Sequence, residues 1–444
     1  MVTDGTAERR EPEIPHKTTP GAAVLTRTEI LQNKWVQGAL IAICFFFIYF
    51  VTSNESNPYN QYALLADAFL DGRLYLEKSP EYLELARYYD SGMACNGPEE
   101  GCKGYVIDPP APAVLLMPFV ALFGADLNQV LVSIAFGAAA IGLFWIATRH
   151  MGWDLRMGAA MTVLLALGTN FWWAAGDGSL WMFSQVSSVF FAMAALVEAT
   201  GQKRPWLVGL LLGLSGLSRL PTFLAFPFFL YLALKDDMRG WREWRAVVLD
   251  RGVIRKVLLF GSGLGAMASL VLLYNYARFH TIFDAGYNHP RYANEPWFAE
   301  GRFHISHIPR HIEGIFYLGP ELTENQFPFF KPSMFGMALI MVTPAFLYVY
   351  GALVKRLEVT AAVAMGLVMI PHLLHGTTGW AQFGYRFSMD YFPMLVVLAA
   401  SGMGHRVGIR GWLAIGLSVF IAMWGPLFFF DTRLEDMLGH QWKL

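Results

Sequence analysis

Long apolar stretches recur along the whole chain, and they constrain its fold more than any other feature. A bilayer core about 30 Å thick is crossed by a helix of about 20 apolar residues. Stretches that approach this length and character are 35–52, 128–148, 157–175, 180–198, 206–218, 221–234, 257–277, 335–354, 358–374, 389–404 and 411–429. Only 15% of the residues are charged, against roughly a quarter in soluble domains. The sequence therefore predicts an all-α polytopic membrane protein with about eleven transmembrane helices.

Lysine and arginine residues predict how these spans are oriented. With the N-terminus in the cytoplasm, every short loop assigned to that side carries a lysine or an arginine, as the positive-inside rule requires. This holds only if 109–123, which is apolar but about 15 residues long, does not cross the bilayer. We therefore predict that 109–123 is an interfacial or re-entrant helix.

The predicted topology divides the chain into a cytoplasmic tail, 1–34, a transmembrane domain, 35–429, and an external C-terminal tail, 430–444. The transmembrane domain contains two large external loops, 53–127 and 278–334, and the first of them holds two surface helices. The lipid bilayer is the first partner that this organisation implies. A formal net charge of −1 leaves no basic excess for nucleic acid. The chain also has no nucleotide-binding glycine loop and no serine-elbow motif, so chemistry on a soluble cytoplasmic donor has no visible site.

Two cysteines, Cys95 and Cys102, lie close together in the polar part of the first external loop. Their spacing suits a short disulfide if the loop faces an oxidising compartment. Two free thiols remain the alternative.

The first external loop opens with an amphipathic helical pattern that ends at Gly72. Its apolar positions recur at three- and four-residue steps; they are Tyr62, Leu65, Ala66, Phe69 and Leu70. Asp67 and Asp71 are four residues apart and share the polar face. They could be the solvated face of a surface helix, or Asp67 could direct its carboxylate at a membrane-level site as a general base.

Glu55 and Asp108 are further acids of the same loop. Glu55 follows the first span directly and could be an ordinary exposed acid. Asp108 precedes Pro109 and Pro110, where it could simply end the loop.

Asp177 lies in a very short external loop, in Trp172-Trp173-Ala-Ala-Gly-Asp177-Gly-Ser-Leu-Trp181. Tryptophan is expected at the membrane interface whatever the function. An acid in so short a loop must also lie at this interface. A role in a site and an ordinary surface charge therefore both remain open.

Three arginines lie at the external ends of predicted spans. Arg219 is costly between two apolar runs unless it pairs with an acid or meets an anion. Arg386 follows Tyr385 and precedes Asp390 by four residues. Arg386 and Asp390 could pair, or the planar guanidinium of Arg386 could bind a phosphate while Asp390 orients it. Arg278 could simply extend to the interface.

The order of these features resembles the GT-C superfamily of integral-membrane glycosyltransferases, in particular the relatives of protein O-mannosyltransferases and aminoarabinose transferases. The resemblance extends over most of 35–404. Its carriers are the first span, the surface helix with Tyr62, Ala66 and Gly72, the second apolar segment from Pro109 to Gly124, Asp177 and Arg219. The segment Phe383-Gly-Tyr-Arg-Phe-Ser-Met-Asp390 looks like the signature of a bacterial subgroup of unassigned substrate.

The resemblance implies a GT-C-like fold and a sugar donor carried on a polyprenyl phosphate. It implies that a carboxylate deprotonates the hydroxyl group of a glycan, lipid or protein acceptor, often with inversion of the anomeric carbon. Arginines would stabilise the departing phosphate, and the candidates are Arg219, Arg386 and Arg278. The residues expected to support this site are Asp177, Asp71, Tyr62, Tyr385 and Asp390. Some members use a divalent cation, Mg²⁺ or Mn²⁺, which Asp177 could help to hold. The implied location is a bacterial-type inner membrane, with the active site facing the periplasm.

One position departs from the family pattern. In the family a catalytic acid, usually within an Asp-Glu pair, stands shortly before the surface helix. Here the matching stretch reads Asn57-Pro58-Tyr59. Asp67, Glu55 and Asp108, in that order, become the candidates for the general base.

Two other functions remain open. A transporter or flippase of lipid-linked sugars would need polar residues along a path across the membrane, whereas the polar candidates gather on one side. A non-catalytic membrane subunit is favoured by the missing acid at Asn57.

Overall fold

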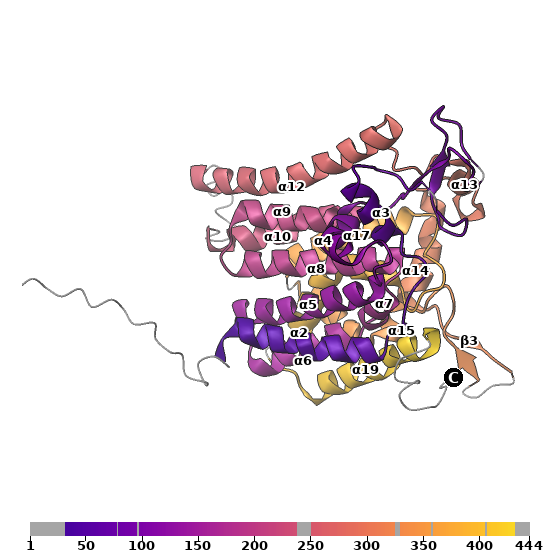
Figure 1. Ribbon diagram of the computed structural model, residues 1–444. Coiled ribbons are helices and arrows are strands. Elements are labelled where there is room, and N and C mark those ends of the chain that lie inside the picture. The colour runs from indigo at the N-terminus through magenta and orange to yellow at the C-terminus, as the bar shows by residue number, and fades with distance from the viewer. Residues whose placement is uncertain are drawn as a thin grey trace, which may run out of the picture.

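The computed structural model describes residues 32–77, 79–95, 97–237, 250–324, 329–356, 358–404 and 406–430. Within them, long helices lie side by side and most connecting segments with structure of their own gather at one end (Figure 1). Most of the two predicted tails, residues 1–31 and 431–444, lies outside the described residues.

Five helices of the described chain are long and apolar enough to cross a membrane. They are α2 (Lys34–Val51), α5 (Gln129–His150), α8 (Leu180–Thr200), α12 (Arg251–Phe279) and α19 (Ile409–Phe429). Side chains fix where several of them begin: Asn33, Asn128 and Asp250 accept hydrogen bonds from backbone amides of the first turns of α2, α5 and α12. The chain is thus an all-α multi-pass membrane protein, as predicted.

The predicted number of about eleven spans is not confirmed. The described residues give up to seven spans if two bent helix pairs each count as one. One pair is α6 (Leu155–Leu167) with α7 (Phe171–Asp177), bent by 48°. The other predicted stretches are helical but short or broken, often beside proline, which cannot donate a backbone hydrogen bond. These shorter elements are α9 (Pro205–Gly216), η1 (Leu220–Ala225), α10 (Phe226–Leu234), η2 (Lys235–Asp237), α15 (Leu339–Val342), η6 (Pro344–Phe346), α16 (Leu347–Val354), α17 (Val359–Leu374), η7 (Arg386–Tyr391) and α18 (Phe392–Met403).

The long helices differ in how deeply they are buried. In the most apolar 18-residue window, 72% of α5 and 83% of α8 is buried, so these helices form the centre of the bundle. Only 17% of α2 and 17% of α12 is buried. Because their exposed side chains are largely apolar, we infer that α2 and α12 face lipid.

The two large predicted external loops contain short elements at one end of the bundle (Figure 1). In 53–127 they are α3 (Gln61–Leu70), β1 (Ala86–Tyr88), β2 (Lys103–Tyr105) and α4 (Ala111–Phe123). In 278–334 they are α13 (Pro290–Ala293), η4 (Pro296–Phe298), η5 (Ile305–His307), α14 (Ile308–Phe316), β3 (Glu321–Leu322) and β4 (Phe330–Lys331). β1 pairs antiparallel with β2, with Ala86 opposite Tyr105, and β3 pairs antiparallel with β4.

The two surface helices of the first loop pack against each other. The predicted apolar positions Tyr62, Leu65 and Ala66 of α3 are fully buried, in a cluster that includes Leu116 of α4. α4 has 13 residues, and a helix of that length spans about 20 Å at 1.5 Å per residue, less than a bilayer core. Its length therefore fits the non-spanning helix predicted for 109–123.

The opposite ends of the long helices carry basic residues. Lys34 at the start of α2 and Arg149 at the end of α5 line one surface hollow together with Gly201 beyond α8. Arg406 and Arg410 line another. These positions agree with the side that the charge pattern predicts to be cytoplasmic.

Candidate active site

Asp108 is fixed between two parts of the membrane domain. It lies between β2 and α4, and the carbonyl of Val106 accepts a hydrogen bond from the Arg278 guanidinium of α12. On the other side the amide of Ala111 donates to the carbonyl of Leu217, just after α9, at 3.1 Å. The short segment around Asp108 is therefore held at both ends.

Asp108 is buried, with 7% of the residue exposed, and the charges of three arginines act on its carboxyl. Burial raises its pKa, while the positive charges of Arg219, Arg386 and Arg278 act in the opposite direction. These are the three arginines predicted from the sequence to meet a phosphate. These three arginines are far apart in the sequence, and in the fold their charges act on one acid. That acid, Asp108, is the third of the predicted candidates for the general base.

Arg219 is held by a buried acid. Its Nε lies 3.3 Å from both carboxylate oxygens of Asp390, and His372 Nε2 lies 2.9 Å from Asp390 Oδ2. The Asp390 side chain is fully buried, and 16% of the Arg219 side chain is exposed. The prediction that Asp390 pairs with or orients Arg386 is therefore wrong, because the Asp390 carboxylate pairs with Arg219 and His372.

Arg386 and Arg219 both lie near one aromatic ring, that of Phe387. The Cζ atoms of Arg219 and Arg386 are 5.5 Å and 5.7 Å from the centroid of the Phe387 ring. Burial, and then the charge of Arg219, lower the pKa of Arg386 to about 10, so it remains protonated at neutral pH. The buried Nε of Arg386 has no hydrogen-bond partner within the described chain. Arg386 can thus still bond an anion.

A glycine gives the Arg386 side chain its space. Gly379 has a φ of +104°, and a Cβ atom there would lie 2.8 Å from Arg386 Nε and 2.7 Å from Gln382 Oε1. Both the backbone conformation and the contact therefore favour glycine.

Replacing Gly379 with alanine should displace the Arg386 guanidinium. If Arg386 binds a phosphate, we expect the affinity for a polyprenyl phosphate to fall about ten-fold or more, because a charge-assisted hydrogen bond contributes about 1.5–3 kcal/mol. Binding to the protein in lipid nanodiscs measures this. Gly319→Ala is the control, since a Cβ atom there meets nothing within 4 Å. Equal affinities of the two variants would contradict the assignment.

Arg278 is already engaged and acts as a positioning residue. Besides its bond to Val106, its Nη2 donates to Asn275 Oδ1 at 2.9 Å. Its Cζ lies 3.7 Å from the centroid of the Tyr274 ring and 4.7 Å from that of Phe279. These contacts hold the Arg278 guanidinium against the segment that carries Asp108, and they occupy two of its nitrogen atoms.

Asp177 ends α7 near Asn57, the position where the resembled family has an acid. Asn57 Nδ2 donates to the Asp177 carbonyl at 3.2 Å and approaches Oδ2 at 3.5 Å. Asp177 Oδ1 accepts from the Ser179 amide at 2.9 Å. No three His, Cys, Asp or Glu side chains converge as metal ligands in the part of the chain that the structure describes. The reaction proposed for this chain therefore uses no cation at Asp177.

The other acids of the first loop that were predicted as candidates lie elsewhere. Asp71 forms an exposed ion pair with Arg73 at 2.7 Å, and Asp67 belongs to the same group of charges. Glu55 is exposed at the end of α2, where its carbonyl accepts a hydrogen bond from Asn128 Nδ2 at 2.7 Å. Of the three acids predicted as candidates for the base, Asp108 is the one on which the charges of Arg219, Arg386 and Arg278 act.

The phenols of Tyr62 and Tyr385 interact with different groups. The phenol of Tyr62 is buried, and the charges of Asp108 and Arg219 both act on it. The phenol of Tyr385 instead bonds His311 Nδ1 at 2.8 Å. Tyr62 thus belongs to the group around Asp108, whereas Tyr385 supports the segment that carries Arg386.

Sequence reasoning did not identify His372, Glu84 and Tyr287. His372 lies inside a predicted span, where an ionisable side chain is itself a signal of function. Glu84 and Tyr287 lie in polar loops among other residues of their kinds, and no local pattern distinguishes them. The charges of both interact with Asp108 in the folded chain.

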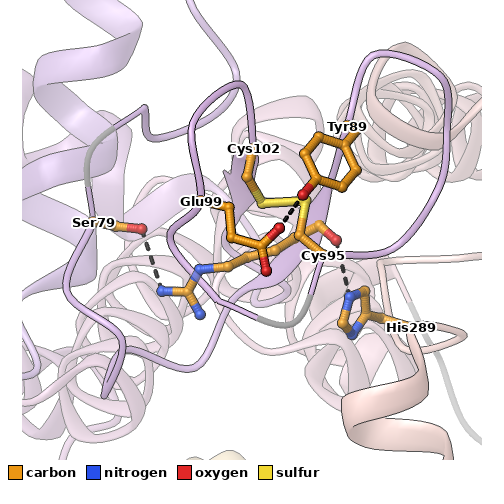
Figure 2. Close-up of a disulfide and its surroundings, with 7 residues drawn as sticks. Ser79, Tyr89, Cys95, Glu99, Cys102 and His289 are labelled. Carbon is orange, nitrogen blue, oxygen red and sulfur yellow. Dashed lines mark hydrogen bonds between the residues drawn. A yellow bond between two sulfur atoms is a disulfide. The ribbon is translucent and has the colours of Figure 1, made fainter.

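A disulfide between Cys95 and Cys102 closes the turn between β1 and β2 (Figure 2), with Cα atoms 6.4 Å apart. The carbonyl of Arg87 in β1 accepts from the Cys95 amide at 2.9 Å and lies 2.9 Å from His289 Nε2. His289 belongs to the second large loop, so the disulfide-bonded turn and that loop meet at one carbonyl. β2 then leads directly to Asp108.

Removing the disulfide should loosen this hairpin. Closure of a loop of this length contributes about 2.5 kcal/mol in the chain-entropy description. In a Cys95→Ala/Cys102→Ala variant we expect faster amide hydrogen exchange over 86–105, with little change in the long helices. Cys44→Ala, which changes the free cysteine of α2, is the control. Unchanged exchange over the hairpin in the double variant would show that other contacts hold it.

Comparisons with known proteins find similarity at the level of structure. No protein-family model matches the chain, and no curated protein sequence matches it. A solved structure of ArnT from Cupriavidus metallidurans bound to undecaprenyl phosphate is similar to it. The two share 15% sequence identity over 86% of this chain and 61% of that chain, with a TM-score of 0.49. The apo structure of the same protein gives 14% identity, the same coverage and a TM-score of 0.45.

A second similar structure is the S. cerevisiae protein O-mannosyltransferase complex bound to the sugar donor. Its identity is 14%, over 60% of this chain and 36% of that chain, with a TM-score of 0.34. Both similar proteins are GT-C glycosyltransferases. This chain spans 61% of the length of the ArnT chain. The roles of individual side chains rest on the geometry of this chain.

Proposed function

We propose that the protein is a membrane glycosyltransferase that moves a sugar from a polyprenyl-phosphate donor to an extracytoplasmic acceptor. The observation that carries this proposal is the buried carboxyl of Asp108 beside two arginines, Arg219 and Arg386. An acid and an anion-binding pair at the external end of a helical bundle match what transfer from a lipid-linked sugar phosphate requires. The sequence pattern, which resembles the GT-C superfamily, supports the same donor.

In the proposed reaction Asp108 takes the proton of an acceptor hydroxyl group. The acceptor oxygen forms a bond to the anomeric carbon of the sugar, while the bond from that carbon to the phosphate oxygen breaks. The polyprenyl phosphate leaves with the electron pair of that bond. Arg219 and Arg386 stabilise the negative charge that grows on the phosphate. Attack from the face opposite to the phosphate inverts the anomeric carbon.

The proposed location is a bacterial-type inner membrane, with the site on the periplasmic side and the N-terminus in the cytoplasm. The basic residues at the opposite helix ends support this orientation. The disulfide between Cys95 and Cys102 supports an oxidising environment for the loop that carries Asp108.

The central experiment supplies donors to the purified protein in lipid nanodiscs. A panel of undecaprenyl phosphates carrying different hexoses and pentoses is incubated with detergent-extracted bacterial envelope glycans and lipids. We expect one donor to be consumed with release of undecaprenyl phosphate, and Arg386→Ala to lose this activity. Arg410→Ala, at an exposed arginine at the opposite end of the bundle, is the comparison variant. If no donor is consumed and no lipid phosphate binds, the proposal fails.

The proposed base predicts a pH dependence. A general base must be deprotonated, and burial raises the pKa of Asp108. As the pH is lowered, Asp108 should therefore become protonated, and activity should fall, before the pH reaches the ordinary aspartic acid pKa of about 3.9. A pH profile of kcat/KM measures this. A rate that stays constant down to that ordinary value would exclude Asp108 as the base.

A non-catalytic subunit that binds the lipid phosphate is the second candidate. Asn57 favours it, because an amide stands where the resembled family has an acid. In that case undecaprenyl phosphate should bind with Arg386 intact, while no donor is consumed. Binding and turnover measured on the same sample separate the two functions.

A further inference from the structure

Glu84 belongs to a segment of the first loop that other residues fix in place. Arg87 donates from Nη2 to the Pro80 carbonyl at 2.7 Å and from Nη1 to the Leu83 carbonyl at 3.3 Å. Arg291 of α13 donates to the same Leu83 carbonyl at 3.3 Å. The residue directly before Glu84 is therefore where the two external loops are joined.

The Glu84 side chain is half-buried and lies among the charges of the site. Its pKa is raised by burial and then by the negative charge of Asp108, while Arg291 and Arg386 act in the opposite direction. Glu84 and Asp108 thus act on each other from two separate segments of one loop. The reaction proposed above uses Asp108 and leaves Glu84 without a role.

Two tyrosines of the second loop pack against the strands of the first: Tyr292 shares a buried cluster with Ala86 and Ile107, the residue before Asp108, and Tyr287 packs against it. The rings of Tyr287 and Tyr292 meet edge to face with centroids 5.8 Å apart, and the charges of Glu84 and Asp108 act on both phenols. The side chain of Tyr292 is 6% exposed, and its hydroxyl group has no partner among the described residues. A buried hydroxyl without a partner is unfavourable, and a ligand hydroxyl could satisfy it.

Two arginines lie near these groups, and the buried Nε of Arg302 has no hydrogen-bond partner among the described residues. The Cζ of Arg302 lies 3.9 Å from the centroid of the Tyr287 ring, and Arg291 donates to the backbone. Glu295 adds another negative charge that acts on Glu84. Glu84, Asp108 and Glu295 are thus acids whose charges meet here. They are suited to accept hydrogen bonds from hydroxyl groups, and a further anion would add to their repulsion.

We infer that Glu84 and Tyr292 form the acceptor subsite and bind the hydroxyl groups of a neutral sugar or polyol unit beside Asp108. This inference rests on the proposed function and deepens it. The donor phosphate lies on the side of Arg219 and Arg386, and the acceptor lies on the side where the two external loops meet. Glu84 selects for hydroxyl groups and against anions, whereas Asp108 takes the proton.

The test uses the full chain in nanodiscs with the donor that the panel identifies. The acceptor probes are octyl glucoside, which is neutral, and octyl glucuronide, which is anionic. We expect the wild-type protein to prefer octyl glucoside. Glu84→Gln should raise the KM for octyl glucoside about ten-fold, the size expected for loss of a hydrogen bond to a charged group, and should reduce the preference over octyl glucuronide. Tyr292→Phe should raise the same KM, and both variants should bind undecaprenyl phosphate as the wild type does.

Matched controls are Glu81→Gln, at an exposed acid of the same segment, and Tyr276→Phe, at an exposed tyrosine of α12. The inference is overturned if Glu84→Gln leaves both the acceptor KM and the preference unchanged, or if only the anionic acceptor is used. It is also overturned if donor is consumed but neither probe accepts the sugar. In all three outcomes the proposed function stands. Absence of both donor consumption and undecaprenyl phosphate binding would remove the proposed function and the inference together.

Discussion

Asp108→Asn should reduce sugar transfer by about 10²–10⁴-fold, the range that a general base contributes. Asparagine has nearly the same size as aspartate and cannot take the acceptor proton. Because the substitution removes a negative charge beside Arg219 and Arg386, we expect undecaprenyl phosphate to bind as tightly as before or more tightly. Turnover of the identified donor and binding of the lipid phosphate, measured on the same preparation, check both parts.

Asp67→Asn is the control for this prediction. Asp67 is half-buried and belongs to the group of charges around Arg73, away from Arg219 and Arg386, so its replacement should change transfer by less than about two-fold, as substitutions away from a site usually do. The opposite pattern, with activity lost at Asp67 and kept at Asp108, would restore the order of candidates that the sequence alone suggests. It would also remove the basis for a site centred on Asp108.

Asp390→Asn should have the largest effect on stability. Breaking a buried ion pair by removing one partner costs about 3–5 kcal/mol, because the other charge stays buried without compensation. Asp390 is fully buried and contacts both Arg219 and His372. We therefore expect a large decrease in the unfolding temperature of the protein in nanodiscs, with loss of lipid phosphate binding through the displaced Arg219.

Asp71→Asn is the matched control. It breaks the ion pair with Arg73, whose atoms are 2.7 Å apart, and 60% of the Asp71 side chain is exposed. Exposed pairs contribute about 0–1 kcal/mol. A double variant, Arg219→Met/Asp390→Asn, should recover part of the stability lost in Asp390→Asn. Equal stability losses for the Asp71 and Asp390 variants would show that Asp390 is not the anchor of Arg219.

The parts of the fold that the sequence predicts are those set by local pattern. Apolar length predicts the long helices, and three- and four-residue steps predict the buried face of α3, including Tyr62 and Leu65. The arginines of the site are also recognisable, because Arg219 and Arg386 interrupt apolar runs. The number of spans is less predictable, because proline breaks several stretches into short or 3₁₀ segments.

The choice of partners inside the site is set by tertiary structure and could not be read locally. Four residues separate Arg386 from Asp390, which makes them an attractive pair on a helix. The structure instead pairs Asp390 with Arg219, 171 residues away. Asp108 carries no distinguishing pattern, and its importance emerges only when three arginines from distant segments surround it.

The distance in sequence between Arg219 and Asp390 also has a consequence for biogenesis. At a synthesis rate of about 5–20 residues per second, the ribosome needs about 10–35 s to make the 171 residues between them. During this interval Arg219 lies between apolar segments without Asp390 as its counter-ion, and an unpaired charge is unfavourable in a lipid environment. Nascent chains that stop before η7 should therefore be targets of membrane quality control, and the site is complete only once η7 has been made.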